Sequence, residues 1–144
     1  MWAVTREEFA ELLQAAARPL RLRPGLVRRD RLVLLTLALT GLRRSELIAL
    51  NWADVITNGE QPSMLIRGAK GGRPRRQPLP PALAAELRAW RAERVAEPGD
   101  PVFCGLAGGR LQATILTGII VRARERAGLS KHVTAHTLRH TAAT

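Results

Sequence analysis

Apolar residues recur at helical spacing in several stretches of the chain, and they define most of the predicted secondary structure. A first helix is predicted after Thr5, where Thr5 and Glu8 stand at the spacing of a capping box. Residues 28–40 are apolar on all sides, which predicts a buried helix that ends at Gly41. Three later helices are predicted: one after Pro80-Pro81 with Leu83, Leu87 and Trp90, one with Leu116, Ile120, Ala123 and Ala127, and a last one capped by Thr134.

Between residues 43 and 79 the pattern predicts a short helix followed by a small sheet. Residues 43–50 are helical in pattern, and residues 52–57 are expected to lead into a first strand. Further strands are predicted at 63–67 and 75–79, with turns at 58–59 and 70–73. Pro74 and Pro78 each remove a backbone donor, so the last strand is expected at the sheet edge. The expected fold class is mainly α with a small three-stranded antiparallel β-sheet (α+β), in a single domain over residues 1–144.

Composition adds a strong positive charge to this picture. The 144 residues carry a formal net charge of +11 and have a pI near 11.7, which favours binding to nucleic acid. Lys70 and Lys131 are the only lysines among the 23 basic residues, and the rest are arginines. A coding sequence biased towards arginine codons is therefore an alternative source of part of this charge. With 3% aromatic residues, stacking on bases is not expected to dominate, and Leu50 and Trp52 are predicted to pack in the core.

The same composition argues against several other classes of protein. Cys104 is the single cysteine, so no internal disulfide forms and no metal-ligand spacing is present. The longest apolar run, 32–42, is shorter than the roughly 20 residues that span a bilayer. No signal-peptide pattern precedes it. A soluble, cytoplasmic protein without a metal site is therefore expected.

Three motifs in order carry the candidate chemistry. They are Thr40-Gly41-Leu42-Arg43-Arg44-Ser45-Glu46-Leu47, the glycine turn beginning at Lys70, and His136-Thr137-Leu138-Arg139-His140-Thr141-Ala142-Ala143-Thr144. Together, and across nearly the whole chain, they resemble the catalytic domain of tyrosine site-specific recombinases of the phage-integrase and Xer type. The resemblance implies strand exchange on double-stranded DNA through a phosphotyrosyl intermediate, with neither metal nor nucleotide cofactor.

The resemblance assigns roles residue by residue. Arg43 and Arg139 match the two arginines that clamp the scissile phosphate, for which planar and permanently charged forks are suited. His136, three residues before Arg139 and so on the same helix face, would take part in proton transfer. Lys70 would protonate the departing 5′ oxygen. Glu46 would hold the active-site cations in position without touching the phosphate itself. DNA contacts are expected from Arg44, Arg73, Arg75 and Arg76.

Purely structural roles are alternatives to these assignments. Lys70 could be a solvated turn lysine, and the family's usual glycine before it is Ala69 here. Glu46 could be an exposed helix carboxylate, whereas His140 fits a core position. Each arginine could also form an ordinary surface ion pair.

The chain contains no tyrosine, so the nucleophile of the family is missing. The sequence therefore predicts an incomplete catalytic domain that does not cleave DNA as it stands. Its expected partners are double-stranded DNA and other recombinase protomers, without a membrane. Two alternatives remain open: a non-enzymatic DNA-binding regulator or decoy derived from a recombinase, and a basic RNA-binding protein that matches by chance.

Overall fold

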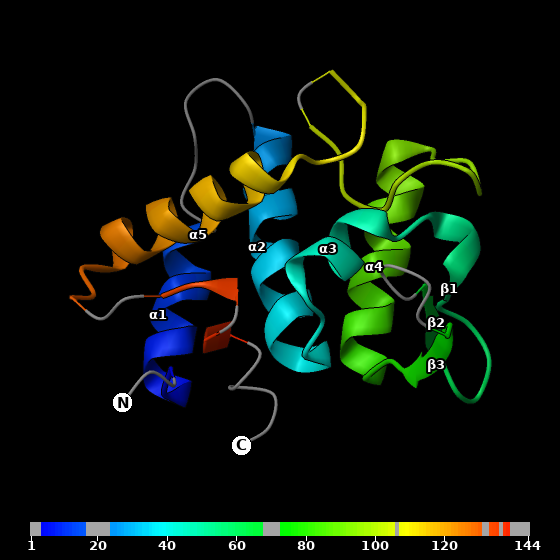
Figure 1. The fold of residues 1–144 in the computed structure, drawn as a ribbon, viewed down its shortest axis with the longest axis horizontal. Helices are drawn as coiled ribbons and strands as arrows, with labels where there is room; N and C mark the ends of the chain where they lie inside the picture. Colours follow the sequence, from blue (N-terminus) through cyan, green and yellow to red (C-terminus); the bar gives the residue numbers. More distant parts are fainter. Residues whose placement is uncertain are drawn as a thin grey trace. The chain divides into compact units, whose positions relative to one another are not determined.

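The structure, a computed structural model, describes residues 4–16, 24–67, 73–105, 107–130, 133–135 and 137–138 (Figure 1). The chain divides into two compact units. The helical unit comprises residues 1–44 and 113–144, and the sheet unit comprises residues 45–112. That residues 1–144 form a single domain stays a prediction.

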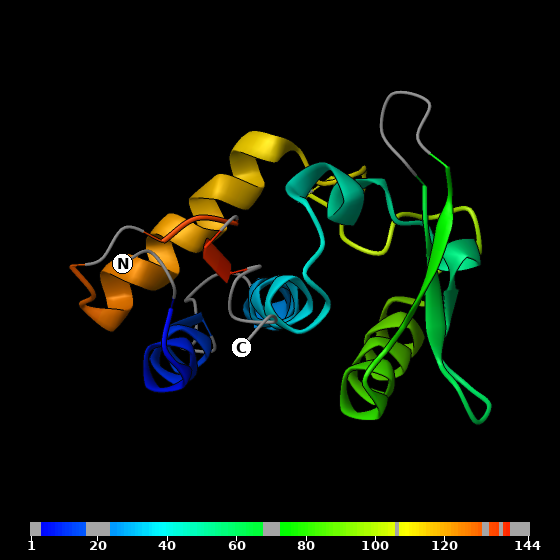
Figure 2. The same ribbon diagram turned by 60° about the horizontal axis from the view of Figure 1, so that its bottom comes forward.

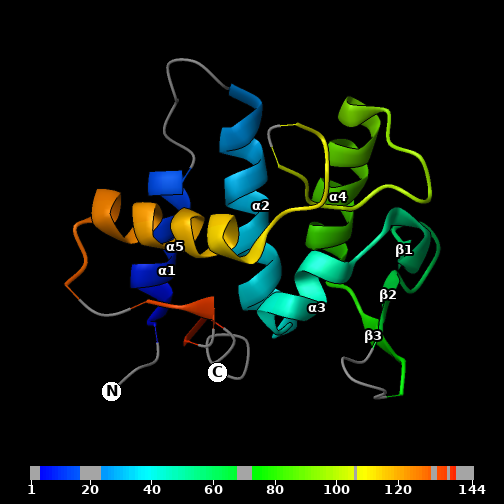
Figure 3. The same cartoon turned by 45° about the horizontal axis from the view of Figure 1, so that its top comes forward.

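The helical unit is built from α1 (Arg6–Ala16), α2 (Pro24–Thr40) and α5 (Ala113–Ala127), and all three pairs of these helices are in contact. Figure 3 shows α5 running across α1 and α2. The middle of α2 is buried on all sides from Leu32 to Ala38, as its pattern predicts. Apolar side chains from α1 and α5 complete the core, namely Leu12, Ala15, Leu116, Ile119, Ile120 and Ala123.

The start of α1 and the C-terminal ends of α2 and α5 are those that the sequence predicts. The capping box of α1 is confirmed, because the Glu8 N–H donates to Thr5 Oγ1 at 3.0 Å and the Thr5 N–H donates to Glu8 Oε1 at 2.9 Å. Gly41 ends α2 with a φ of 69°, and Gly128 follows α5 with a φ of 72°. Both lie in the left-handed region that glycine adopts without strain.

The sheet unit contains α3 (Arg44–Ala49, whose first residue belongs to the helical unit), the 3₁₀ helix η1 (Trp52–Asp54), strands β1 (Val55–Ile56), β2 (Ser63–Ile66) and β3 (Arg75–Pro78), and α4 (Pro81–Arg94). The strands form an antiparallel sheet in the order β1-β2-β3, with Val55 opposite Met64 and Ile66 opposite Arg75. The predicted fold class and the edge position of the last strand are both confirmed.

Helix α4 lies along the sheet, as Figure 2 shows, and it buries Leu83, Leu87 and Trp90 as predicted. Its Trp90 Nε1–H donates to the Val102 carbonyl at 3.0 Å, which fastens α4 to the segment that follows it. Leu50 and Trp52 are also buried, at 4% and 1% exposure, so their predicted packing role is confirmed.

Two predicted boundaries differ from the structure. Helix α2 begins at Pro24, earlier than residue 28, because proline is well suited to a first helical turn, where its missing N–H needs no partner. Residues 52–57 are predicted as an exit into the first strand; that strand, β1, covers only Val55–Ile56, because Trp52–Asp54 form a 3₁₀ turn. The Asp54 carboxylate accepts the Asn51 N–H at 3.2 Å, and the Asp54 N–H donates to the Asn51 carbonyl at 2.9 Å, which closes this turn.

No helix among the described residues is long and apolar enough to cross a membrane. Within the same residues, no group of three or more His, Cys, Asp or Glu side chains is arranged to hold a metal ion.

Candidate functional site

Arg43 lies in a short connection whose neighbours set its position. Gly41 turns the chain out of α2, and its N–H donates to the Leu37 carbonyl at 3.0 Å. The next residue, Leu42, is completely buried, whereas Arg43 is exposed. The buried leucine thus anchors the chain one residue before the arginine.

Glu46 lies on α3 and is buried, which excludes the alternative that it is an exposed helix carboxylate. Its Oε2 accepts Arg75 Nη1 at 2.9 Å, and its Oε1 accepts Arg75 Nη2 at 3.5 Å. The pair is therefore bidentate and joins α3 to strand β3, which follows the Lys70 turn in the sequence. Sequence reasoning placed Arg75 on DNA and did not find this partner.

Arg110 holds the other end of α3. Its Nη1 donates to the Ile48 carbonyl at 2.8 Å, and its Nη2 donates to Asn51 Oδ1 at 2.6 Å. A cation at a helix C-terminus satisfies free carbonyl groups and opposes the negative end of the helix dipole. This residue was also missed, since it stands in a glycine-rich loop 60 residues or so from its partners and no local pattern links them.

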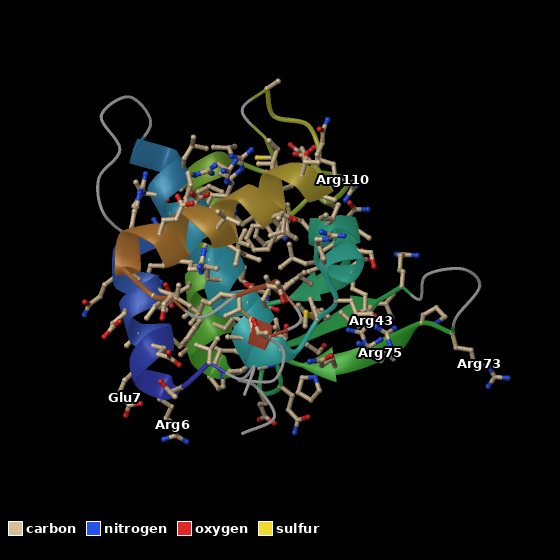
Figure 4. All side chains as sticks on the ribbon, turned by 60° about the vertical axis from the view of Figure 1, so that its left-hand side comes forward. Arg6, Glu7, Arg43, Arg73, Arg75 and Arg110 are labelled. Carbon is tan, nitrogen blue, oxygen red and sulfur yellow. The ribbon has the colours of Figure 1, made fainter. Side chains whose placement is uncertain are left out.

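The remaining arginines of the predicted DNA surface differ in their surroundings. Arg44 Nη1 donates to Thr117 Oγ1 on α5 at 3.0 Å, and Arg76 Nη1 donates to Ser63 Oγ on β2 at 2.9 Å. Arg73 is exposed, and Figure 4 shows it beyond the end of the strand that carries Arg75. All are surface residues, and DNA contact through them stays a prediction.

A further ion pair stabilises the sheet unit. Arg67, at the end of β2, donates from Nη2 to Asp54 Oδ1 at 2.8 Å. This hydrogen bond and the negative charge of Asp54 raise the pKa of Arg67 above its ordinary value.

Lys70, His136 and Arg139 lie outside the described residues, as do His140 and the turn at residues 70–72. The described residues at the start of the last motif confirm the predicted cap: the Thr137 N–H donates to Thr134 Oγ1 at 3.2 Å, and the Thr134 N–H donates to Thr137 Oγ1 at 2.8 Å. That Arg43, Lys70, His136 and Arg139 share one site stays a prediction.

The arrangement of motifs and fold is matched by known proteins. The sequence profile of the phage integrase family matches residues 3–144. The chain belongs to the phage integrase family. Among its family relatives, tyrosine recombinase XerC of Corynebacterium efficiens is 38% identical over 119 residues, which are 81% of this chain and 37% of XerC. XerC of Xanthomonas campestris pv. campestris is 37% identical over 112 residues, 78% of this chain and 34% of the relative.

Solved structures of family members have the same fold. The XerH site-specific recombinase in a post-cleavage complex with a palindromic difH substrate superposes with a TM-score of 0.81 and 28% identity, covering all of this chain and 41% of XerH. The catalytic core of lambda integrase superposes with a TM-score of 0.75 at 21% identity, covering 99% of this chain and 81% of that core. The chain thus spans little more than a third of the XerC relatives, and its fold is that of recombinase catalytic domains.

Proposed function

We propose that this chain supplies the phosphate-activating part of a site-specific tyrosine recombinase, which cleaves and rejoins DNA strands. The observation that carries the proposal is the family match over residues 3–144, because that range includes Arg43, Lys70, His136 and Arg139 in the family's order. Double-stranded DNA and other recombinase protomers are the proposed partners, and the cytoplasm is the proposed location.

Arg43 and Arg139 are the proposed clamp on the scissile phosphate. A phosphodiester under attack gains negative charge on its nonbridging oxygens, and two guanidinium groups stabilise that charge more than the ground state. His136 follows the Thr134 cap by two residues, so in the proposed final helix it stands in the first turn, where free N–H groups favour an anion. Lys70 is the proposed donor of a proton to the leaving 5′ oxygen.

The chain has no tyrosine, so these 144 residues by themselves form no phosphotyrosyl bond. Incubation with a suicide DNA substrate is expected to give no covalent protein–DNA band on a denaturing gel. Such a band would identify a nucleophile other than tyrosine and contradict the proposal.

A chimera tests the activity itself. In it, the 144 residues replace the matching part of XerH, which is bound to difH DNA in its complexes and so provides a substrate. A suicide difH duplex is expected to give covalent adduct with the chimera. Arg139→Ala should lower the rate at least about a hundredfold, because a transition-state charge donor contributes about 2.7–4 kcal/mol.

The outcomes separate the alternatives. A chimera that binds difH but forms no adduct would support the non-enzymatic DNA-binding module instead. Adduct formed at an unchanged rate by the Arg139→Ala chimera would defeat the assignment of Arg139. A preference of the 144-residue chain for RNA over duplex DNA would favour the RNA-binding alternative.

A further inference from the structure

The bond between Glu46 and Arg75 joins two segments on which the proposed chemistry depends. Glu46 stands three residues after Arg43, and Arg75 stands five residues after Lys70. The side chain of Glu46 is 3% exposed and that of Arg75 is 49% exposed, with 2.9 Å between Oε2 and Nη1. The contact therefore connects a buried carboxylate on α3 to the first residue of β3.

Because Glu46 is buried, its carboxylate depends on Arg75 as a partner. A carboxylate removed from water needs charged or hydrogen-bonding partners, and losing one of them is destabilising. A bidentate guanidinium also fixes orientation, which a lysine at the same position could not do. The fork of Arg75 is thus engaged by protein, with Nη1 and Nη2 both directed to Glu46.

We propose that Arg75 is a positioning residue: its bidentate bond to Glu46 locks the start of β3 onto α3 and so sets the segment that carries the leaving-group acid. Arg75 acts through protein and not as a contact to DNA phosphate. The inference rests on the proposed function, in which Lys70 protonates the 5′ oxygen.

Arg76 is the matched control. It is the next residue on β3, it is exposed, and its Nη1 donates to Ser63 Oγ of the neighbouring strand, within the sheet and not to α3. Arg75→Gln and Arg76→Gln remove the same charge from adjacent positions. A difference between them therefore reports the bond to Glu46 and not the loss of one positive charge.

The first experiment uses the 144-residue chain and measures amide hydrogen exchange. Glu46→Gln and Arg75→Gln are expected to speed exchange in α3 and in β2 and β3, while Arg76→Gln leaves α3 unchanged. Because the two mutations break the same bond, the double variant should exchange no faster than either single one. Equal exchange in the Arg75 and Arg76 variants, or an equal rise throughout α2 and α5, would overturn the lock.

The second experiment separates positioning from general damage. The XerH chimera is given difH DNA in which sulfur replaces the 5′ bridging oxygen of the scissile phosphate. With oxygen, the tyrosine oxygen bonds to phosphorus, the P–O bond breaks, and the leaving oxygen takes a proton from the acid. With sulfur, the P–S bond breaks and the thiolate leaves unprotonated, because the pKa of a thiol is far below that of the alcohol that leaves from the ordinary substrate.

Arg75→Gln is expected to slow cleavage of the ordinary substrate by about tenfold to a hundredfold, the range for a displaced catalytic group, and the sulfur substrate should restore most of the rate. Lys70→Ala should behave alike. In Arg76→Gln the ratio of the two cleavage rates should equal that of the parent, because the loss of a DNA contact slows both substrates by the same factor. An Arg75→Gln chimera that is unimpaired, or that stays slow on sulfur, would overturn the inference alone. A parent chimera inactive on both substrates would count against the proposed function, while the exchange experiment still tests the lock.

Discussion

Single side chains with little exposure hold the turns of the sheet unit. Asp54 is 4% exposed, and its carboxylate accepts both the Asn51 N–H, at 3.2 Å, and the guanidinium of Arg67. One buried acid therefore closes the 3₁₀ turn and joins it to the end of β2. The residues next to Asp54 in the sequence do not indicate that Asn51 and Arg67 are its partners.

Asp54→Ala is expected to lower the free energy of unfolding by about 1–3 kcal/mol, since it removes the acceptor that closes the 3₁₀ turn on the half-buried Asn51 N–H and that holds Arg67. Urea denaturation followed by tryptophan fluorescence measures the change. Arg67→Ala should lower stability less than Asp54→Ala, because the exposed Arg67 is readily replaced by water on its own side while the buried carboxylate keeps the hydrogen bond from the Asn51 N–H. Equal losses in the two variants would contradict this account.

Helix α2 buries a charged pair within its own apolar packing. Arg29 and Asp30, adjacent on α2, form a buried ion pair with 2.8 Å between Arg29 Nη2 and Asp30 Oδ1. Burial raises the pKa of Asp30 above its ordinary value of 3.8, although Arg29 on the same helix and Arg122 and Arg126 on α5 oppose this rise. The balance shows that removal from water outweighs these cations.

A raised pKa in the folded state has a definite sign in its effect on stability. Above pH 3.8, the folded chain keeps a proton that the unfolded chain has released, so this contribution to stability is lost as the pH rises through the raised pKa. The stability of the parent relative to Asp30→Asn should therefore fall between about pH 4 and pH 7. Urea titrations at both pH values measure it, and a relative stability that rises with pH would refute the assignment.

At the scale of the whole chain, the positive charge determines how it meets a polyanion. A net charge of +11 is carried largely by arginines; Arg75 and Arg76 lie on the edge strand β3, and Arg73 precedes that strand by two residues. Contacts to phosphate position a protein on duplex DNA without reading its sequence. Weak binding with little sequence preference is therefore expected from the 144 residues alone.

Salt titration tests this expectation. The logarithm of the affinity for duplex DNA should fall linearly with the logarithm of salt concentration, with a slope of about −0.9 for each phosphate contacted. Arg73→Gln should reduce the steepness by about one contact, whereas Arg75→Gln should leave it nearly unchanged because that guanidinium is bound to Glu46. Binding that does not depend on salt would contradict the electrostatic account.

The sequence by itself determined the features that depend on neighbours along the chain. Helical periodicity, the Thr5 and Glu8 capping box, the glycine ends of α2 and α5, and the edge position of a proline-bearing strand are local, because each is decided within a few residues. The family motifs are likewise recognised from short spacings. Assigning chemistry to Arg43, Lys70, His136 and Arg139 required the resemblance, and their shared site remains a prediction.

Only the tertiary structure decided which charges are paired. The partners Glu46 and Arg75, Asp54 and Arg67, and Arg110 and the end of α3 are separated by 29, 13 and about 60 residues. In a chain with 23 basic residues, sequence spacing cannot select one arginine for one carboxylate. The choice follows from which side chains the folded backbone brings within reach, and from the need of a buried carboxylate for a partner.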